Sequence, residues 1–320
     1  MPNNIIKGKK IWLIGAGIIS AEYVKVLLEL DCDITVISRG KRKLKNLKKF
    51  KKKIRIFYGG ISNYLKNSPE KPHKVIIASN ARYLYEISIL MIKYGVKSIL
   101  VEKPGALKLE EFKKLKKIIK KNNVIFKIAY NRRFYGSIKY LNKILKKNKI
   151  RSIYFDLTEW LQKIKTSNYS KQELNKWFLC NSSHITDLVF YLIGYPKKIN
   201  FMYKDSIKWH KPVLFNGYGI SKRNIPFSYR GDWLSYGRWE IKVFFKDFLV
   251  NLKPIETIEI KYIANKDTKK IKNFDYEKLY KPGLFFMCKD FLNNNYKNFC
   301  TIDQQILNIK FINNILGWKK

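Results

Sequence analysis

Short apolar runs alternate with amphipathic stretches along the first 131 residues of the chain. The amphipathic stretches, residues 21–30, 81–94 and 109–121, have apolar positions three or four apart, which is typical of helices that cover a core. Because parallel strands need helical crossovers, this alternation predicts a doubly wound α/β domain with helices on both faces of a parallel sheet. The six expected strands are residues 11–14, 34–38, 54–58, 74–79, 98–101 and 125–130.

The pattern changes after residue 131, where longer stretches alternate apolar with polar positions. The clearest of them places four bulky side chains on one face: Trp239, Ile241, Val243 and Phe245. Period-two alternation indicates an antiparallel sheet with one face on a core and the other toward water or a partner. We therefore expect two domains, residues 1–131 with the parallel sheet and residues 132–320 with an open, mainly antiparallel sheet in an α+β arrangement.

The chain has 66 Lys and Arg residues against 24 Asp and Glu residues, a formal net charge of +42. Such a field attracts polyanions, so a nucleic-acid or anionic-membrane partner is one interpretation. The charge is spread along the whole chain, however, and the densest run, residues 41–53, keeps Leu44, Leu47 and Phe50 three apart. That spacing predicts an amphipathic helix with a solvated basic face. We therefore favour compositional bias and expect no specific nucleic-acid partner.

The four cysteines stand far apart and form no CxxC pair, so the sequence predicts neither a disulfide scaffold nor a metal site. No apolar run approaches the roughly 18 residues needed to cross a bilayer. These features favour a reducing, cytoplasmic location. Residues 9–28 have the outline of a secretory signal peptide, but their removal would take the first strand out of the predicted sheet. We therefore interpret them as the first strand, turn and helix of the domain.

The motif GAGIIS, residues 15–20, joins the first strand to the first helix. Gly15 permits a tight turn, and Gly17 lets the backbone approach a pyrophosphate at the positive end of the helix. Ser20 replaces the third glycine of the usual pattern but is still small enough for close packing. In this context the motif indicates a dinucleotide-binding Rossmann domain. The cofactor contacts predicted for the turn are Gly15, Ala16, Gly17, Ile18 and Ile19.

The end of the second strand suggests which dinucleotide is bound. NAD-selective sites usually carry an acidic residue there for the ribose 2′-hydroxyl. In this chain Ser38 and Arg39 occupy that end, whereas Asp31 and Asp33 precede the strand at the opposite edge of the sheet. An arginine is a planar, permanently charged fork that suits a 2′-phosphate. The sequence therefore predicts NADP(H) in preference to NAD(H).

The fifth strand runs into Glu102-Lys103-Pro104, and the sixth ends in AYNRRF, residues 129–134. With the opening turn, these motifs resemble the glucose-fructose oxidoreductase and inositol dehydrogenase family over essentially the whole chain. The resemblance implies that Lys103 lies beside the nicotinamide and the reacting oxygen, where a cation can stabilise alkoxide character, and that the peptide before Pro104 is cis. The other cofactor contacts expected near strand ends are Ser79, Asn80, Glu102 and Asn131.

The family's second motif, D-x-G-x-H-x-x-D, corresponds here to CNSSHITD, in which Cys180 and Ser182 replace the acid and the glycine. His184 is the candidate general acid/base because imidazole titrates near physiological pH, although a helical histidine can also be purely structural. A thiol cannot orient an imidazole as a carboxylate does. Either Asn181, Ser182 or a distant carboxylate has taken over, or the chemistry has changed. Asp187 either buttresses His184 or pairs locally.

Residues 227–245, FSYRGDWLSYGRWEIKVFF, are rich in aromatic residues and arginine and are expected to form a hairpin-like region. Such side chains suit a sugar ring with a phosphate, although an aromatic sheet face buried against another subunit is the alternative. Residues 215–229 are rich in glycine and polar side chains and are expected to form a loop over the substrate. The predicted substrate-binding residues are Asn181, Asp187, Tyr229, Trp233 and Arg238.

These observations predict an NADP(H)-dependent oxidoreductase that transfers hydride between nicotinamide and a carbohydrate carbon. A nucleotide sugar in surface-glycan biosynthesis is the narrower hypothesis. Lys103 would polarise the reacting oxygen and His184 would exchange its proton. Two alternatives stay open: a reductase of a non-sugar carbonyl or imine, and a non-catalytic NADP-binding sensor or scaffold, which Cys180 favours. The family resemblance also implies a homo-oligomer, a dimer or a tetramer, formed through the C-terminal sheet.

Overall fold

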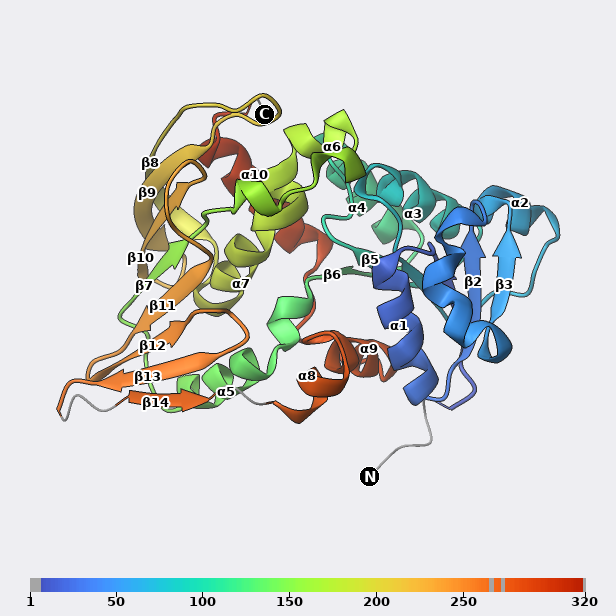
Figure 1. Cartoon of the computed structure of the whole chain (residues 1–320), viewed down its shortest axis with the longest axis horizontal. Coiled ribbons are helices and arrows are strands. Elements are labelled where there is room, and N and C mark those ends of the chain that lie inside the picture. Colours follow the sequence, from blue (N-terminus) through green and yellow to red (C-terminus); the bar gives the residue numbers. More distant parts are fainter. Residues whose placement is uncertain (1–6, 265–267, 272–273, 319–320) are drawn as a thin grey trace. The chain divides into compact units, whose positions relative to one another are not determined.

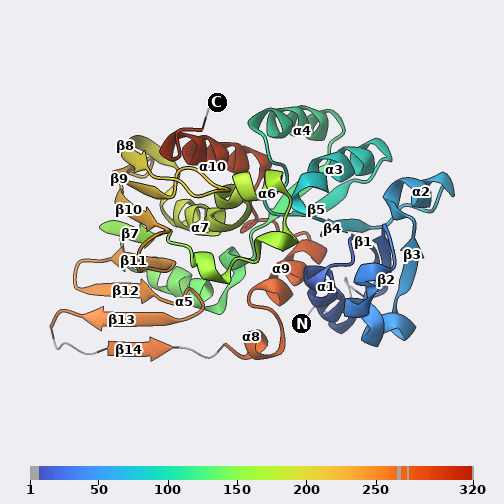
Figure 2. The same ribbon diagram turned by 45° about the horizontal axis from the view of Figure 1, so that its top comes forward.

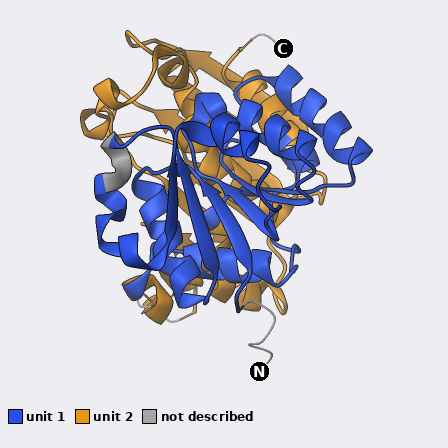
Figure 3. Ribbon diagram, turned by 90° about the vertical axis from the view of Figure 1, so that its right-hand side faces the viewer, with its two compact units in different colours: residues 1–131, 279–305 blue, residues 132–278, 306–320 orange. Residues whose placement is uncertain are grey.

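The computed structural model (Figure 1) describes residues 7–264, 268–271 and 274–318. The chain forms two compact units, one of residues 1–131 and 279–305 and the other of residues 132–278 and 306–320 (Figure 3). The first unit therefore includes a segment that follows most of the second unit along the chain. The continuous stretch 132–320 expected from the sequence is thereby interrupted, because residues 279–305 pack with the first unit.

A parallel sheet forms the centre of the first unit, with the strand order β3-β2-β1-β4-β5-β6 (Figure 1). The chain starts in the middle of the sheet, builds one half outward and then crosses over to build the other half. Each predicted strand is found, with its ends shifted by one or two residues. The strands are β1 (Lys10–Ile14), β2 (Asp33–Ser38), β3 (Arg55–Tyr58), β4 (Lys74–Ile77), β5 (Ser98–Glu102) and β6 (Ile125–Ala129).

Helices lie on both faces of this sheet, which confirms the doubly wound arrangement (Figure 2). Helices α1 and α9 pack together on one face, and α3 and α4 pack together on the other. With both faces covered, the central strands β1 and β4 are almost completely buried, and all of their residues except Lys10 and Lys74 are apolar. The helices of this part of the chain are α1 (Ile18–Glu29), α2 (Gly60–Lys66), α3 (Leu84–Lys93), α4 (Leu109–Lys121) and α9 (Leu284–Leu292), with the short 3₁₀ helices η2 (Ala81–Tyr83) and η3 (Asn131–Phe134).

The basic run after β2 forms a 3₁₀ helix, η1 (Arg42–Lys53), where the sequence predicts an amphipathic helix. Leu47 is buried and Phe50 is half-buried, while the lysines around them are exposed. The side chain of Leu44 lies outside the described residues. Like charges three and four residues apart destabilise an α-helix, which is consistent with the irregular winding of so basic a stretch.

A mixed sheet with the order β14-β13-β12-β11-β7-β10-β9-β8 dominates the second unit (Figure 2). Strands β7 and β10 pair in parallel and the other neighbouring strands pair antiparallel. The open, mainly antiparallel sheet is therefore confirmed. The strands are β7 (Ser152–Asp156), β8 (Pro196–Lys204), β9 (Leu214–Ser221), β10 (Pro226–Asp232), β11 (Glu240–Phe244), β12 (Phe248–Leu252), β13 (Ile258–Tyr262) and β14 (Thr268–Ile271).

Helices cover one face of this second sheet and bury an aromatic core (Figure 2). The rings of Phe190 and Phe311 lie 4.7 Å apart, and those of Phe155 and Tyr229 are stacked at 5.5 Å. The helical segments are α5 (Gly136–Leu145), η4 (Leu161–Lys163), η5 (Thr166–Asn168), α6 (Lys171–Asn175), the π-helix η6 (Phe178–Ser182), α7 (Ser183–Ile193), α8 (Asp275–Leu279) and α10 (Ile302–Ile315), of which α8 and α10 cross between the units.

Two sequence-based expectations in this unit are wrong. Residues 215–229 do not form a loop over a substrate, because most of them belong to the paired strands β9 and β10. Residues 227–245 do not form a hairpin, because β7 lies between β10 and β11. The alternation along β11 is confirmed, since its four predicted core side chains are all buried: Trp239, Ile241, Val243 and Phe245.

Candidate cofactor and substrate sites

The glycine turn between β1 and α1 leaves room for a ligand on one side only. Gly15 has a φ of +126°, and a Cβ atom there would lie 2.3 Å from the carbonyl oxygen of Ala78, so no larger residue fits. Gly17 caps α1, and a Cβ atom there would meet nothing within 4 Å. Open space at the start of a twelve-residue helix, next to its free backbone N–H groups, suits a pyrophosphate.

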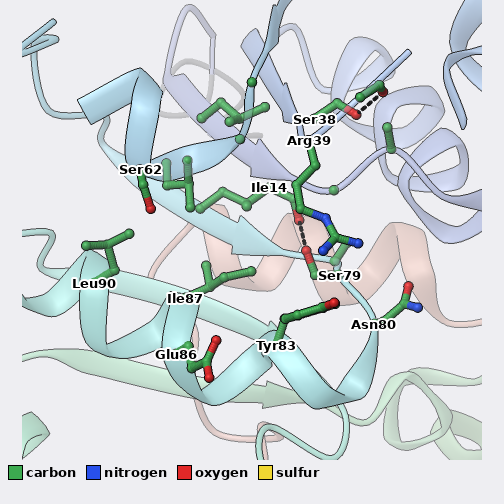
Figure 4. Close-up of a pocket in the computed structure, with 18 of the residues that line it drawn as sticks. Ile14, Ser38, Arg39, Ser62, Ser79, Asn80, Tyr83, Glu86, Ile87 and Leu90 are labelled. Carbon is green, nitrogen blue, oxygen red and sulfur yellow. Dashed lines mark hydrogen bonds between the residues drawn. The ribbon is translucent and has the colours of Figure 1, made fainter. Parts of the chain in front are cut away.

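A cavity of about 510 Å³ opens beside this turn, at the carboxyl ends of β1, β2 and β4 (Figure 4). This edge of an open α/β sheet, where the strand order reverses, is the usual location of ligands. Seven of the predicted cofactor residues line the cavity: Gly15, Ala16, Gly17, Ser38, Arg39, Ser79 and Asn80. Several further residues line the cavity without belonging to a recognisable sequence motif, among them Tyr83, Ser62 and Ile87.

Arg39 reaches from the end of β2 into the cavity, toward Ser79 and Tyr83 (Figure 4). Its guanidinium lies 4.4 Å from the centre of the Tyr83 ring, and that of Arg82 lies 4.6 Å from the same ring. The Ser38 hydroxyl donates a hydrogen bond to the carbonyl of Gly40 at 2.8 Å and shapes the strand end. Glu86, on α3, is the one carboxylate among the described lining residues. The end of β2 is therefore basic.

Other predicted cofactor residues do not line this cavity: Ile18, Ile19, Glu102, Lys103 and Asn131. Ile18 is 78% exposed next to the glycine turn, so its apolar surface is available to a bound molecule. Asn131 follows β6 and donates a hydrogen bond to the carbonyl of Pro282 at 3.0 Å. Its side chain is therefore fixed by the segment that returns to the first unit.

The turn after β5 has the cis peptide between Lys103 and Pro104 that the family resemblance implies. Glu102 accepts a hydrogen bond from the hydroxyl of Tyr23 at 2.8 Å, and burial raises the pKa of its carboxyl group. The carbonyl of Pro104 accepts a hydrogen bond from the amide of Gln305 at 3.1 Å. The returning segment therefore also supports the turn that presents Lys103.

In the second unit, a buried carboxylate lies next to the turn in which Cys180 replaces the family's acid. Glu159 follows β7 and accepts hydrogen bonds from Asn181 Nδ2 at 2.9 Å and from Ser182 Oγ at 2.6 Å. Burial raises the pKa of Glu159, while its hydrogen bonds act in the opposite direction. Both donors lie in the π-helical turn before α7, a kind of turn that is frequent at functional sites. Glu159 therefore contacts the two residues that follow Cys180, which occupies the family's acid position.

His184 is buried in the first turn of α7, with its ring centre 6.4 Å from that of Trp239. Asp187, one turn later, is fully buried and pairs with Arg133 through bonds of 2.6 and 2.8 Å. Asn308 also donates a hydrogen bond to it at 3.0 Å. Asp187 is thus held by two residues that are far away from it along the chain.

The predicted substrate residues of the 227–245 stretch differ in their surroundings. Tyr229 is buried in the aromatic core, where burial raises the pKa of its hydroxyl group. Trp233 is also buried, and its indole N–H donates a hydrogen bond to the carbonyl of Leu157 at 3.2 Å. Arg238 is half-exposed and donates to Glu159 at 3.3 Å. Of the three, Arg238 has the most accessible polar group.

The described residues contain no group of three or more His, Cys, Asp and Glu side chains placed to hold a metal ion. Within the same residues, no helix is both long and apolar enough to cross a membrane. The residues of the first unit do fit a dinucleotide, because an open glycine cradle, a helix start and a basic strand end line one cavity.

This fold and cavity define a dinucleotide-binding α/β protein. A family model described as an oxidoreductase family with an NAD-binding Rossmann fold (GFO_IDH_MocA) matches residues 9–130. The predicted resemblance to the glucose-fructose oxidoreductase and inositol dehydrogenase family is thereby confirmed for this domain. The protein is therefore an oxidoreductase with an NAD-binding Rossmann fold. No curated protein matches the chain by sequence.

Solved structures that resemble the chain span nearly all of it. UDP-N-acetylglucosamine 3-dehydrogenase GnnA from Acidithiobacillus ferrooxidans is 14% identical, with a TM-score of 0.76 and 97% of each chain covered. The WlbA dehydrogenase from Bordetella pertussis, in complex with NADH and UDP-GlcNAcA, is 13% identical, with a TM-score of 0.72 and coverage of 98% of this chain and 96% of that chain. An oxidoreductase from Agrobacterium radiobacter, in complex with NAD+, L-tartaric acid and magnesium, is 10% identical, with a TM-score of 0.78 and the same coverage. At these identities the likeness shows the fold.

Proposed function

We propose that the protein is an NADP(H)-dependent oxidoreductase that acts on a carbohydrate, with a nucleotide sugar of surface-glycan biosynthesis as the narrower substrate class. The observation that carries the cofactor part is the position of Arg39 in the cavity, at the strand end where NAD-selective sites carry a carboxylate. When bound, the nicotinamide would supply the hydride-transfer chemistry.

The surroundings of Arg39 support a phosphate-bearing ribose. Its guanidinium already lies over the ring of Tyr83, which lines the cavity, and the guanidinium of Arg82 contacts the same ring. A guanidinium offers paired donors to phosphate oxygens, whereas it cannot accept the hydrogen bond of a free 2′-hydroxyl as a carboxylate does. The cofactor preference follows from this difference.

We assign the proton and charge chemistry to two side chains. Lys103 would bind the reacting oxygen and stabilise its negative charge, and His184 would hold the proton that this oxygen loses or gains. Glu159 would replace the family's acid, because its bonds to Asn181 and Ser182 fix the turn before His184. A non-catalytic sensor, which Cys180 favours, would have no need of this buried carboxylate.

The side chains of the second unit and the similar structures both support a sugar as the substrate. Arg238 lies 5.0 Å from the ring of Trp160 and 4.5 Å from that of Trp239, an aromatic and cationic surface that suits a sugar with an anionic group. Two of the similar structures are of a UDP-sugar dehydrogenase and a dehydrogenase bound to UDP-GlcNAcA. A non-sugar substrate is the second candidate, because another similar structure contains L-tartaric acid.

We also propose a cytoplasmic homo-oligomer, a dimer or tetramer, assembled through the second sheet. The strand register places Met202 and Tyr218 on the sheet face that carries Arg230 rather than on the face with the aromatic core, and both are well exposed. Exposed apolar side chains on a broad sheet mark an interaction surface. The cytoplasmic location is proposed because the four cysteines stand far apart along the chain and form no CxxC pair.

Titration of the purified protein with NADPH and NADH, followed by cofactor fluorescence, tests the cofactor assignment. We expect tighter binding of NADPH and a reversed preference in Arg39→Asp. Lys41→Asp makes the same charge change outside the cavity and should keep the preference. Equal binding of both cofactors by the wild type would overturn the assignment. Turnover of nucleotide sugars, free sugars and hydroxy acids, with Lys103→Ala and His184→Ala as inactive controls, then tests the substrate class.

A further inference from the structure

Two cavities of the second unit meet at one exposed tryptophan. They measure about 430 and 600 Å³ and share Glu159, Trp160 and Lys163. Trp160 is 42% exposed, which is unusual for so large an apolar side chain in a domain with an extensive core. Its ring therefore borders both cavities and is accessible to a ligand.

Neighbouring groups hold Trp160 in place. Its indole N–H donates a hydrogen bond to the carbonyl of Gly237 at 2.8 Å, and the Arg238 guanidinium lies 5.0 Å from its ring. Arg238 is itself fixed by Glu159 and by the ring of Trp239. Because the tryptophan is already ordered, a ligand that stacks on it loses little of its binding energy to side-chain ordering. A rigid aromatic face of this kind suits a sugar ring.

The charge around Trp160 is strongly positive. Lys163, Lys165 and Arg238 line the cavities, and among the described residues that line them Glu159 is the one carboxylate. The Glu159 side chain is only 2% exposed, and it accepts hydrogen bonds from Arg238, Asn181 and Ser182. Its charge is therefore directed into the protein. The exposed ammonium groups of Lys163 and Lys165 stay available to an anion in solution.

We propose that Trp160, Lys163, Lys165 and Arg238, the Trp160 site, bind an anionic saccharide. The sugar ring stacks on Trp160, and a phosphate, diphosphate or carboxylate group of the same molecule contacts the two lysines. The proposal rests on the proposed function, because the ligand is the substrate or product of the oxidoreductase. It narrows that function to sugars with a negative charge and assigns the charge recognition to side chains of the second unit.

Binding to the full chain without cofactor, measured by isothermal titration calorimetry, tests the site. The probes are UDP-glucose, glucose 1-phosphate and glucuronate, with methyl glucoside as the neutral sugar. The anionic probes that the site recognises should bind about tenfold or more tightly than methyl glucoside does. The double variant Lys163→Gln with Lys165→Gln should abolish this difference in affinity. Trp160→Ala should weaken the binding of every saccharide, charged or neutral. The matched control, Lys197→Gln with Lys198→Gln on β8, removes the same charge elsewhere and should change nothing.

The outcomes separate the Trp160 site from the proposed function. Equal affinity for charged and neutral sugars, or an anion preference that survives the double lysine variant, would overturn the site. Tight binding of UDP-glucose would identify a diphosphate as the recognised anion, whereas tight binding of glucuronate would identify a carboxylate. Either result supports the site. Anion binding at Trp160 in a protein that binds no NADPH would contradict only the proposed function. Turnover of neutral sugars without any anion preference would contradict only the site.

Discussion

Two arginine–carboxylate pairs of the second unit have the same chemistry in opposite surroundings. Arg133 and Asp187 are each 1% exposed and are joined by two hydrogen bonds, of 2.6 and 2.8 Å. Arg238 and Glu159 are joined at 3.3 Å, and the arginine side chain is 36% exposed. Burial isolates the first pair from solvent, whereas the second keeps one face of its arginine accessible.

This difference shows that a motif match does not determine what a charged residue does. Asp187 matches the family's motif, yet its oxygens bond to Arg133 and Asn308, so it links three segments of the interior. Glu159 lies outside the motif, yet it bonds to the turn before His184 and to an accessible arginine. We therefore assign structural stability to the first pair and ligand positioning to the second.

Asp187→Asn should have the largest effect, because it leaves Arg133 as an uncompensated charge in the interior. We expect the free energy of unfolding to fall by about 3 to 5 kcal/mol. Urea denaturation followed by far-UV circular dichroism measures it. The double variant Arg133→Met with Asp187→Leu removes both charges and should recover much of the loss. A loss below about 1 kcal/mol in Asp187→Asn would show that burial does not distinguish the two pairs.

The first unit could be predicted from the sequence in detail because its signals are local. A few neighbouring residues are enough to recognise the strand and helix periods, the glycine turn and the arginine at the end of β2. The glycine turn and this arginine line the same cavity. The turn after β5 carries a recognisable motif for the same reason. Its support by Gln305 could not be foreseen, because the partner lies about 200 residues away along the chain.

The second unit was harder to predict because its arrangement depends on distant pairing. Residues 227–245 have the composition of a hairpin, but β7 enters between β10 and β11 from much earlier in the chain. No local pattern encodes such an insertion, whose register is set by burial of one sheet face. Glu159 was missed for a related reason: it is a lone carboxylate whose partners are more than 20 residues away.

The first unit contains a buried cation that is held by uncharged groups, in contrast to the two arginine–carboxylate pairs of the second unit. Lys74 is 4% exposed, and the hydrogen-bond partners of its ammonium in the described part of the chain are all uncharged: Ser98, Asn294 and Tyr296. Burial lowers its pKa from 10.5 to about 8. The native state is therefore destabilised by the charged lysine below about pH 8, and this cost disappears as the pH rises toward the unfolded-state pKa of 10.5.

We expect the stability of the wild type, relative to Lys74→Met, to rise by about 2 to 3 kcal/mol between pH 7.5 and pH 10.5. The comparison with the variant cancels the titration of other groups, such as Tyr23, whose pKa burial raises. Urea denaturation at both pH values provides the measurement, with the exposed Lys71→Met as the matched control. A pH-independent difference would mean that Lys74 is solvated or paired in solution.

Glu159→Gln tests the half-exposed pair and should have the smallest effect on stability, about 1 kcal/mol at neutral pH. Burial raises the pKa of Glu159, so the native state favours the neutral carboxyl group. The advantage of the wild type over the neutral variant should therefore be greatest near pH 4 and decrease as the pH rises through the native pKa. The turnover rate should fall by about tenfold, because the glutamine no longer holds Arg238 and the turn before His184 in the same way. The affinity for NADPH should stay unchanged. If Glu159→Gln destabilises the protein as much as Asp187→Asn does, both pairs serve the fold and the functional distinction between them is wrong.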